Sequence, residues 1–187
     1  TVILEELKMY HDLPQYYVME LLEELIWPNH PLGTSLAGTH QTVSRLSDAD
    51  IKHFHRHNYV PQNIVISVCG DIDHETIVNM VNKKLGKLKN VDPKEYLPAP
   101  KVQDKATARF FKKDTEQMHL ALGYLAYETN HKDYYVMSTL SIILGGNMSS
   151  RLFNEVREDR GLAYSIGSSL KTLDDTGMFL VRAGVDN

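Results

Sequence analysis

The stretch from Gly145 to Ser169 constrains the fold of this chain more tightly than any other. It reads GGNMSSRLFNEVREDRGLAYSIGSS and combines a glycine pair, a short helix, a glycine stop and a strand. Ser149 or Ser150 can cap the helix, and Gly161 can supply the left-handed residue that ends it. We therefore expect a helix of about two turns that leads directly into a strand over residues 163–170.

Arg157 and Tyr164 stand out within this stretch. The expected elements place Arg157 on the last helical turn and Tyr164 at the start of the strand, so a cation and a phenol can converge at one point on the surface. The alternative is structural: an arginine at a helix C-terminus interacts favourably with the helix dipole, and the tyrosine can be half-buried. The residues alone leave both interpretations open.

The segment from Thr1 to Tyr10 has the apolar spacing of a helix. The positions three and four residues away from Glu6 are all largely apolar: Val2, Ile3, Met9 and Tyr10. A carboxylate in such a stripe is costly unless a metal ion, a hydrogen-bond donor or a cation compensates it. The alternative is a residue near the helix end that reaches water. Glu5 differs, because Lys8 follows it at helical spacing.

Other elements follow from periodicity and from helix-capping residues. Helices are expected after Asp12 as N-cap, after Ser47 with Asp50 in a capping box, after the turn at Asp71–Asp73 with Gly86 as stop, and over about 132–144. Strands are expected at 64–69, 107–112, 117–127 and 178–185, the last as hairpin partner of 163–170. Between Asn90 and Lys105, prolines and charges replace apolar periodicity, which indicates a linker.

Composition narrows the class of protein. The chain of 187 residues has a formal net charge of -4 and no basic stripe, so nucleic acid is not an expected partner. No apolar run is long enough to span a bilayer, and no signal peptide opens the sequence. The lone Cys69 lies in an apolar alternating run, which favours a buried thiol in a reducing compartment. The opening without methionine indicates a fragment of a longer protein.

Histidines offer a second possible metal site. His53 and His57 are four residues apart on one helix face, a geometry that can hold zinc. No carboxylate or third histidine obviously completes the set, so whether this pair binds any metal stays open. His30 is expected to be structural, and His119 to be a strand residue that faces the other side of the sheet from Met118.

Three motifs together resemble the M16 metallopeptidases, the family of pitrilysin, insulin-degrading enzyme and the mitochondrial processing peptidases. They are VILEELKMYHDLP at the start, HPLG with NYVPQNIVISVCGDID in the middle, and LGGNMSSRLFNEVREDRGLAYSIGSS near the end. The similarity extends over essentially the whole chain and is greatest to the short bacterial processing-protease branch.

The resemblance implies an α+β fold built from two homologous M16-type α/β sandwich domains, each only partly present. Residues 1–90 would be the C-terminal part of the first domain, 91–105 the linker, and 106–187 the N-terminal part of the second. A bacterial member of this branch is expected in the cytoplasm.

Members of the family bind zinc through an inverted His-x-x-Glu-His helix and a distant glutamate, and the glutamate between the histidines acts as general base. The segment that carries the distant ligand matches VILEEL, so the resemblance implies Glu6 as a Zn²⁺ ligand. The His-x-x-Glu-His motif itself is absent from these 187 residues. The order of the family predicts it upstream of Thr1, and the fragment alone is expected to be inactive.

The second domain of family members carries an arginine and a tyrosine that hold the substrate backbone and stabilise the oxyanion. Arg157 and Tyr164 match this pair in type and spacing, whereas Arg160 is expected to be structural. In dimeric relatives the pair completes the active site of the opposite subunit, so a homodimer is expected. The resemblance thus implies a zinc endopeptidase that cleaves peptides or unfolded, presequence-like segments. The alternative is a non-catalytic M16-like subunit that binds peptide or supports a catalytic partner.

Overall fold

The computed structural model describes residues 2–92 and 95–186. Its contacts divide the chain into two compact units, one of residues 1–43 and 97–187 and the other of residues 44–96. Within the predicted linker, residues 93 and 94 lie outside the described residues. Each unit is described by itself below.

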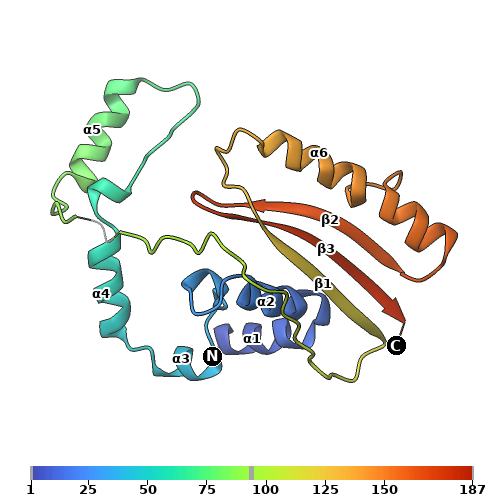
Figure 1. Cartoon of the computed structure of the whole chain (residues 1–187). Coiled ribbons are helices and arrows are strands. Elements are labelled where there is room, and N and C mark those ends of the chain that lie inside the picture. Colours follow the sequence, from blue (N-terminus) through green and yellow to red (C-terminus); the bar gives the residue numbers. More distant parts are fainter. Residues whose placement is uncertain (1, 93–94, 187) are drawn as a thin grey trace. The chain divides into compact units, whose positions relative to one another are not determined.

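The first unit is built around a three-stranded antiparallel sheet with the strand order β1-β3-β2 (Figure 1). Its strands are β1 (Gln117–Ala126), β2 (Ser165–Thr172) and β3 (Gly177–Asp186), so the predicted strand at 117–127 and the predicted hairpin are confirmed. Leu173 N donates to Thr176 O at 2.9 Å and closes the turn between β2 and β3. Because β3 is central, β1 and β2 are both edge strands of the described sheet.

One face of the sheet packs on α2 (Pro14–Ile26), which follows α1 (Val2–Asp12) after a short break. The core joins Leu22, Ile26, Trp27, Met178 and Leu180. Gly123 of β1 faces the same helix, since a Cβ there would lie 3.0 Å from Leu22 Cδ1. His119 shares this face through the alternation of the strand, as expected. Glu23 and Lys171 form an ion pair that ties α2 to β2.

The opposite face of the sheet is covered by α6 (Tyr134–Gly145), which lies along β2 in Figure 1. Small residues make this contact: Ser168 Oγ donates to Ser141 O at 2.8 Å, and a Cβ on Gly145 would lie 2.4 Å from Ser168 N. The larger apolar residues Val136, Leu140 and Ile143 of α6 are exposed. Only small residues let a helix and a strand approach closely, so the larger apolar residues of α6 lie away from the contact with β2.

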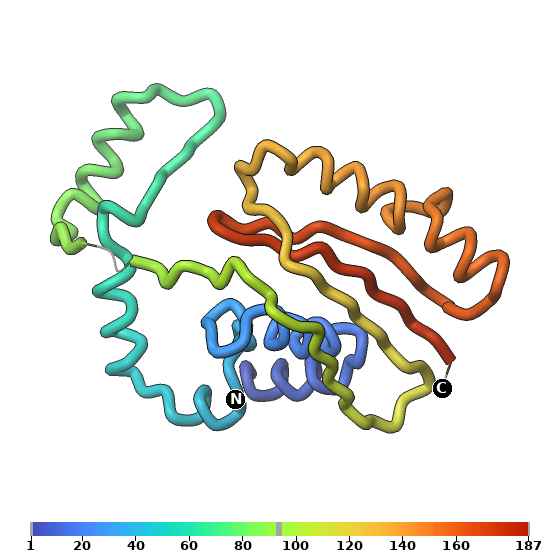
Figure 2. Tube along the Cα trace, viewed as in Figure 1, coloured from blue at the N-terminus to red at the C-terminus, as the bar shows by residue number. Residues whose placement is uncertain are grey.

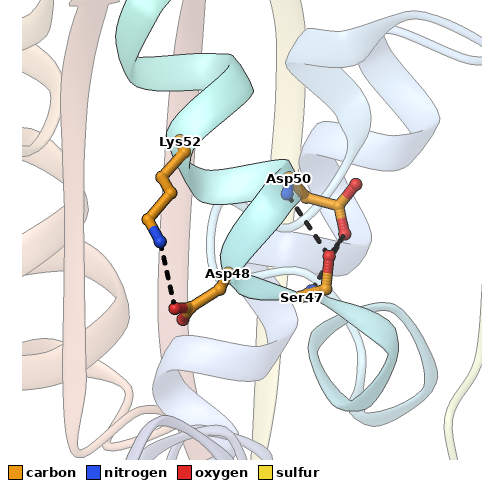
Figure 3. Close-up of polar contacts among 4 residues, drawn as sticks. All are labelled: Ser47, Asp48, Asp50 and Lys52. Carbon is orange, nitrogen blue, oxygen red and sulfur yellow. Dashed lines mark hydrogen bonds and ion pairs between the residues drawn. The ribbon is translucent and has the colours of Figure 1, made fainter.

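The second unit contains α4 (Asp48–Asn58) and α5 (His74–Leu85). The predicted capping box of α4 is confirmed: Asp50 N donates to Ser47 Oγ at 3.3 Å, and Ser47 N donates to Asp50 Oδ2 at 2.9 Å (Figure 3). The Ser47 hydroxyl donates to the same Asp50 oxygen at 2.6 Å, and this bond, together with that from Ser47 N, lowers the pKa of the Asp50 carboxyl below its ordinary value. Gly86 ends α5 as predicted.

Two predicted strands are wrong. Residues 64–69 and 107–112 form no strand in the part of the chain that the structure describes. Val65 and Phe110 are 95% and 94% exposed, so each run is extended chain without a neighbouring strand. A strand needs a neighbouring strand for its backbone hydrogen bonds, and the described residues provide no such neighbour for these two runs. Cys69 is consequently exposed and not buried.

Two predicted caps are also wrong. Asp12 belongs to α1, its carboxylate pairs with Lys113 at 3.1 Å, and Leu13 is the N-cap of α2. In the Gly145–Ser169 stretch, the Asn147 side chain and not a serine accepts from a backbone amide, that of Ser149, at 2.9 Å. Ser150 Oγ is buried and has no hydrogen-bond partner among the described residues.

The mixture of helices with a small antiparallel sheet makes the fold α+β, as predicted. The tube in Figure 2 follows the chain from α1 through the second unit and back to the sheet. No helix among the described residues is long and apolar enough to cross a membrane.

Candidate functional site

The helix that carries Arg157 is a π-helix, η3 (Phe153–Asp159). Just beyond its end, Gly161 N donates to Arg157 O at 3.2 Å and Leu162 N donates to Val156 O at 2.9 Å. Gly161 then adopts a φ of 61° and stops the helix, as the sequence predicted. π-Helical turns are rare and often occur at functional sites. Nothing in the sequence indicated a π-helix here. The spacing of the apolar residues is compatible with an α-helix and equally with one wider turn.

Arg157 lies against its own helix. Its guanidinium carbon is 4.6 Å from the centroid of the Phe153 ring, and its Nε is 3.7 Å from a carboxylate oxygen of Glu158. The side chain remains 40% exposed. Arg160 differs, because its guanidinium contacts Glu155 at 2.5 Å and 2.9 Å, which agrees with the structural role expected for it. Both arginines are therefore paired with a nearby glutamate, and the Arg160 side chain is 62% exposed.

Tyr164 marks the start of β2. Its backbone N donates to Gly184 O at 2.8 Å, which fixes its main chain to the central strand. The residue is nevertheless 72% exposed, so its ring lies on the surface. No hydrogen bond or ring contact among the described residues joins Tyr164 to Arg157, although Gly161 turns the chain between them. The structure thus leaves both side chains accessible, near each other in sequence and without a mutual contact.

Glu6 lies on α1 as predicted, and its four apolar neighbours are themselves exposed. Their exposed fractions are 73% for Val2, 52% for Ile3, 49% for Met9 and 43% for Tyr10. Glu5 forms an ion pair with Lys8 at 2.9 Å, whereas no described residue donates a hydrogen bond or an ion pair to the Glu6 carboxylate. Glu6 is itself exposed, so its carboxylate reaches water, as the alternative interpretation expects, and it is also accessible to a cation.

Glu6 and Arg157 lie on opposite sides of the sheet of the first unit. Figure 1 shows α1 beside α2 on one side and α6, followed by η3, on the other. Among the described residues, no hydrogen bond or ion pair joins Glu6 to Arg157 or Tyr164. The expected site residues fall into two separate groups.

The described residues could supply only part of a zinc site. Among the described residues, no group of three or more histidine, cysteine, aspartate or glutamate side chains could hold a metal ion. Glu6 is thus at most one ligand of such a site. His53 and His57 stack with ring centroids 4.1 Å apart, and His57 Nδ1 bonds to His53 O at 2.8 Å. His30 is structural as expected, since Leu32 N donates to its ring at 3.2 Å.

Comparison with known proteins gives a consistent result. A family model described as the peptidase M16 inactive domain matches residues 45–187. An uncharacterized zinc protease of Bacillus subtilis, YmxG, is 37% identical over 184 residues, which cover 98% of this chain and 44% of the relative. An uncharacterized zinc protease of Streptomyces coelicolor is 37% identical over 97% of this chain and 41% of its own length. The chain therefore spans less than half the length of these curated relatives.

Solved structures agree on the fold. A protease from Helicobacter pylori matches 99% of this chain and 46% of its own, with 30% identity and a TM-score of 0.85. A peptidase M16 inactive domain from Pseudomonas fluorescens matches 98% of this chain and 45% of its own, with 23% identity and a TM-score of 0.86. At 23% identity, the similarity to the Pseudomonas fluorescens structure shows only a shared fold.

Proposed function

Because the chain belongs to the peptidase M16 family, we propose that it is part of a zinc-dependent endopeptidase that cleaves peptides or unfolded, presequence-like segments. The observation that carries this proposal is Glu6, an exposed carboxylate among apolar neighbours that has no partner among the described residues. The names of the relatives, which are zinc proteases, support the same reaction class. Residues 1–90 and 106–187 would then belong to two successive homologous domains.

In this proposal Glu6 is one zinc ligand, and the remaining ligands and the general base come from the part of the protein that precedes Thr1. When bound, zinc polarises the scissile carbonyl and lowers the pKa of its water. Arg157 binds carbonyl oxygens of an extended peptide through its planar guanidinium. The Tyr164 hydroxyl donates a hydrogen bond to the oxygen that becomes negatively charged. Both side chains are exposed enough to reach a bound peptide.

We further propose a homodimer in which each subunit contributes its arginine and tyrosine to the zinc site of the other. The separation of Glu6 from Arg157 by the sheet supports this arrangement. A non-catalytic, peptide-binding subunit is the second candidate, and the description of the matching family model as an inactive domain favours it. The first candidate requires zinc and turnover, whereas the second requires neither.

Metal removal distinguishes the two candidates. We expect the full-length protein to cleave an unstructured fluorogenic peptide, to lose this activity after dialysis against a chelator, and to regain it when stoichiometric Zn²⁺ is added. The reason is that a polarised carbonyl and an activated water both depend on the metal. Cleavage is measured by fluorescence and bound zinc by elemental analysis. A protein that binds the peptide but shows neither zinc nor cleavage would support the non-catalytic subunit instead.

A further inference from the structure

Polar side chains gather on the α2 side of the sheet, at the end toward which the arrow of β3 points in Figure 1. His119 of β1 and Ser165 of β2 both lie opposite Gly184 of the central strand. Residues opposite each other direct their side chains to the same face, and Gly184 shares its face with Leu180, which packs in the core with α2. The imidazole and the hydroxyl therefore flank a residue that has no side chain.

Three side chains reach the space above Gly184. A Cβ added there would lie 3.0 Å from Ser165 Oγ, 3.1 Å from Gln117 Oε1 and 3.7 Å from His119 Cε1. None of these three side chains has a hydrogen-bond partner among the described residues, and Gly184 itself is buried. Scattered polar side chains on a surface are satisfied by water, whereas polar groups that converge on one point can bind a ligand together.

Arg182 adds a positive charge beside this point. It precedes the glycine by two residues on β3, so its side chain leaves the same face of the sheet. Its neighbours across the sheet, Ala121 and Gly167, have no polar side chain, and Arg182 forms no ion pair in the part of the chain that the structure describes. Arg182 and His119 both border a hollow of about 530 Å³. The guanidinium is therefore accessible to a ligand in this hollow.

We call Gln117, His119, Ser165 and Arg182 the Gly184 cluster. Their guanidinium, hydroxyl, amide and imidazole groups can all donate hydrogen bonds, and a guanidinium binds a carboxylate through two parallel bonds. Asp186 is the acidic residue of β3 on this face, and it lies opposite Gln117 without an ion pair to Arg182 among the described residues. The charge of Arg182 is thus left without a direct partner, and it favours an anion over a metal ion.

We propose that the Gly184 cluster binds a carboxylate of the peptide substrate, with Arg182 as its charged anchor. This inference rests on the proposed function, since it gives that site a preference for peptides with a carboxylate. Tyr164 adjoins the cluster, because it precedes Ser165 and its amide donates to Gly184 O at 2.8 Å. An acidic side chain and the C-terminus of a peptide offer the same chemistry to the cluster.

Calorimetric titration of the full-length protein tests the proposal. A chelator is present, so that the peptides are not cleaved and their carboxylates cannot bind zinc. Three otherwise identical, uncharged peptides carry a central glutamate with an amidated C-terminus, a central glutamine with an amidated C-terminus, or a central glutamine with a free C-terminus. We expect a peptide that supplies the carboxylate to have a Kd about tenfold below that of the neutral peptide.

The three peptides also identify the source of the carboxylate. Tighter binding of the first peptide assigns an acidic side chain, and tighter binding of the third assigns the C-terminus. Equal Kd values for all three peptides would overturn the proposal.

Arg182→Gln should reduce the preference for the carboxylate to within about twofold and leave the Kd of the neutral peptide nearly unchanged, because only the charge-assisted hydrogen bonds are lost. Arg151→Gln is the matched control. Arg151 is also exposed and forms no ion pair among the described residues, so its replacement changes the net charge equally. A preference that survives Arg182→Gln, or that both variants lose equally, would contradict a role for Arg182 as the anchor.

Gly184→Ala gives an independent measurement, because its methyl group would occupy the point on which the side chains converge. The contacts of this methyl group are with the ends of flexible side chains, so the fold can adapt. Loss of one hydrogen bond to the carboxylate should weaken the Kd of the preferred peptide about fivefold. The melting temperature verifies folding, and a folded variant with the wild-type Kd would contradict binding at this point.

Cleavage of a neutral fluorogenic peptide is recorded separately with zinc present. A carboxylate preference without any cleavage would leave the Gly184 cluster as a binding site and remove the proposed peptidase function. Zinc-dependent cleavage with equal Kd values for the three peptides would do the reverse.

Discussion

Glu6→Gln in the full-length protein should abolish both zinc retention and peptide cleavage. Glutamine keeps the size of the side chain but removes the negative charge that binds the metal. Changes around the ligands of a metal site already cost about 10- to 100-fold, so loss of a ligand should lower kcat/KM by at least about a hundredfold. Zinc per protomer is measured by elemental analysis after gel filtration, and cleavage with a fluorogenic peptide.

Glu5→Gln is the matched control, because Glu5 is the adjacent carboxylate of α1 and is already paired with Lys8. Exposed pairs at helical spacing contribute only about 0.3–0.5 kcal/mol, so this variant should keep its zinc, its activity and its melting temperature. Full zinc occupancy in Glu6→Gln would eliminate Glu6 as a ligand. Equal loss of zinc in both variants would show a general effect of charge on α1.

Tyr164→Phe should lower kcat and leave zinc bound. The change removes one hydroxyl from an exposed ring, so the fold has little to lose. Removal of a single oxyanion donor typically costs on the order of 10²–10³ in kcat, and we expect an effect of about a hundredfold. Steady-state kinetics and zinc analysis of the same preparation provide the measurement.

Tyr124→Phe is the control for this change, because Tyr124 is another exposed tyrosine, on β1. It should have wild-type kinetics. Wild-type turnover of Tyr164→Phe would remove the assigned role of the hydroxyl. A raised KM with an unchanged kcat would indicate that the hydroxyl binds substrate and transition state equally.

Helices were largely predictable from this sequence, because their signals are local. The box of Ser47 and Asp50 and the stop at Gly86 both lie within a few residues of the ends they define. Strands were less predictable. The run at 64–69 alternates like a strand, yet pairing depends on a partner elsewhere in the chain, and the described residues supply none. Alternation of apolar and polar residues shows that a segment is compatible with a strand, but it does not show whether a partner strand is present.

The surroundings of the candidate site residues were only partly predictable from the sequence. Arg157 and Tyr164 are accessible, as a site requires, and Gly161 ends the helix between them as expected. The π-helix and the contact of Arg157 with Phe153 left no signal in the sequence. The edge position of β2 was also unpredictable, because it depends on strand order, which is a property of the whole sheet. The roles of Glu6, Arg157 and Tyr164 stay predictions.

A mixture of two inactive variants tests most directly whether these three residues form one catalytic centre across a dimer. Glu6→Gln and Tyr164→Phe are purified separately, mixed in equal amounts, allowed to exchange subunits and assayed for peptide cleavage. In a hybrid dimer, the intact Glu6 of one subunit meets the intact Tyr164 of the other, so one of the two sites is whole. Random exchange should therefore restore about one quarter of the wild-type activity per protomer. Activity no higher than the mean of the separate variants, in a mixture with proven subunit exchange, would contradict a shared site.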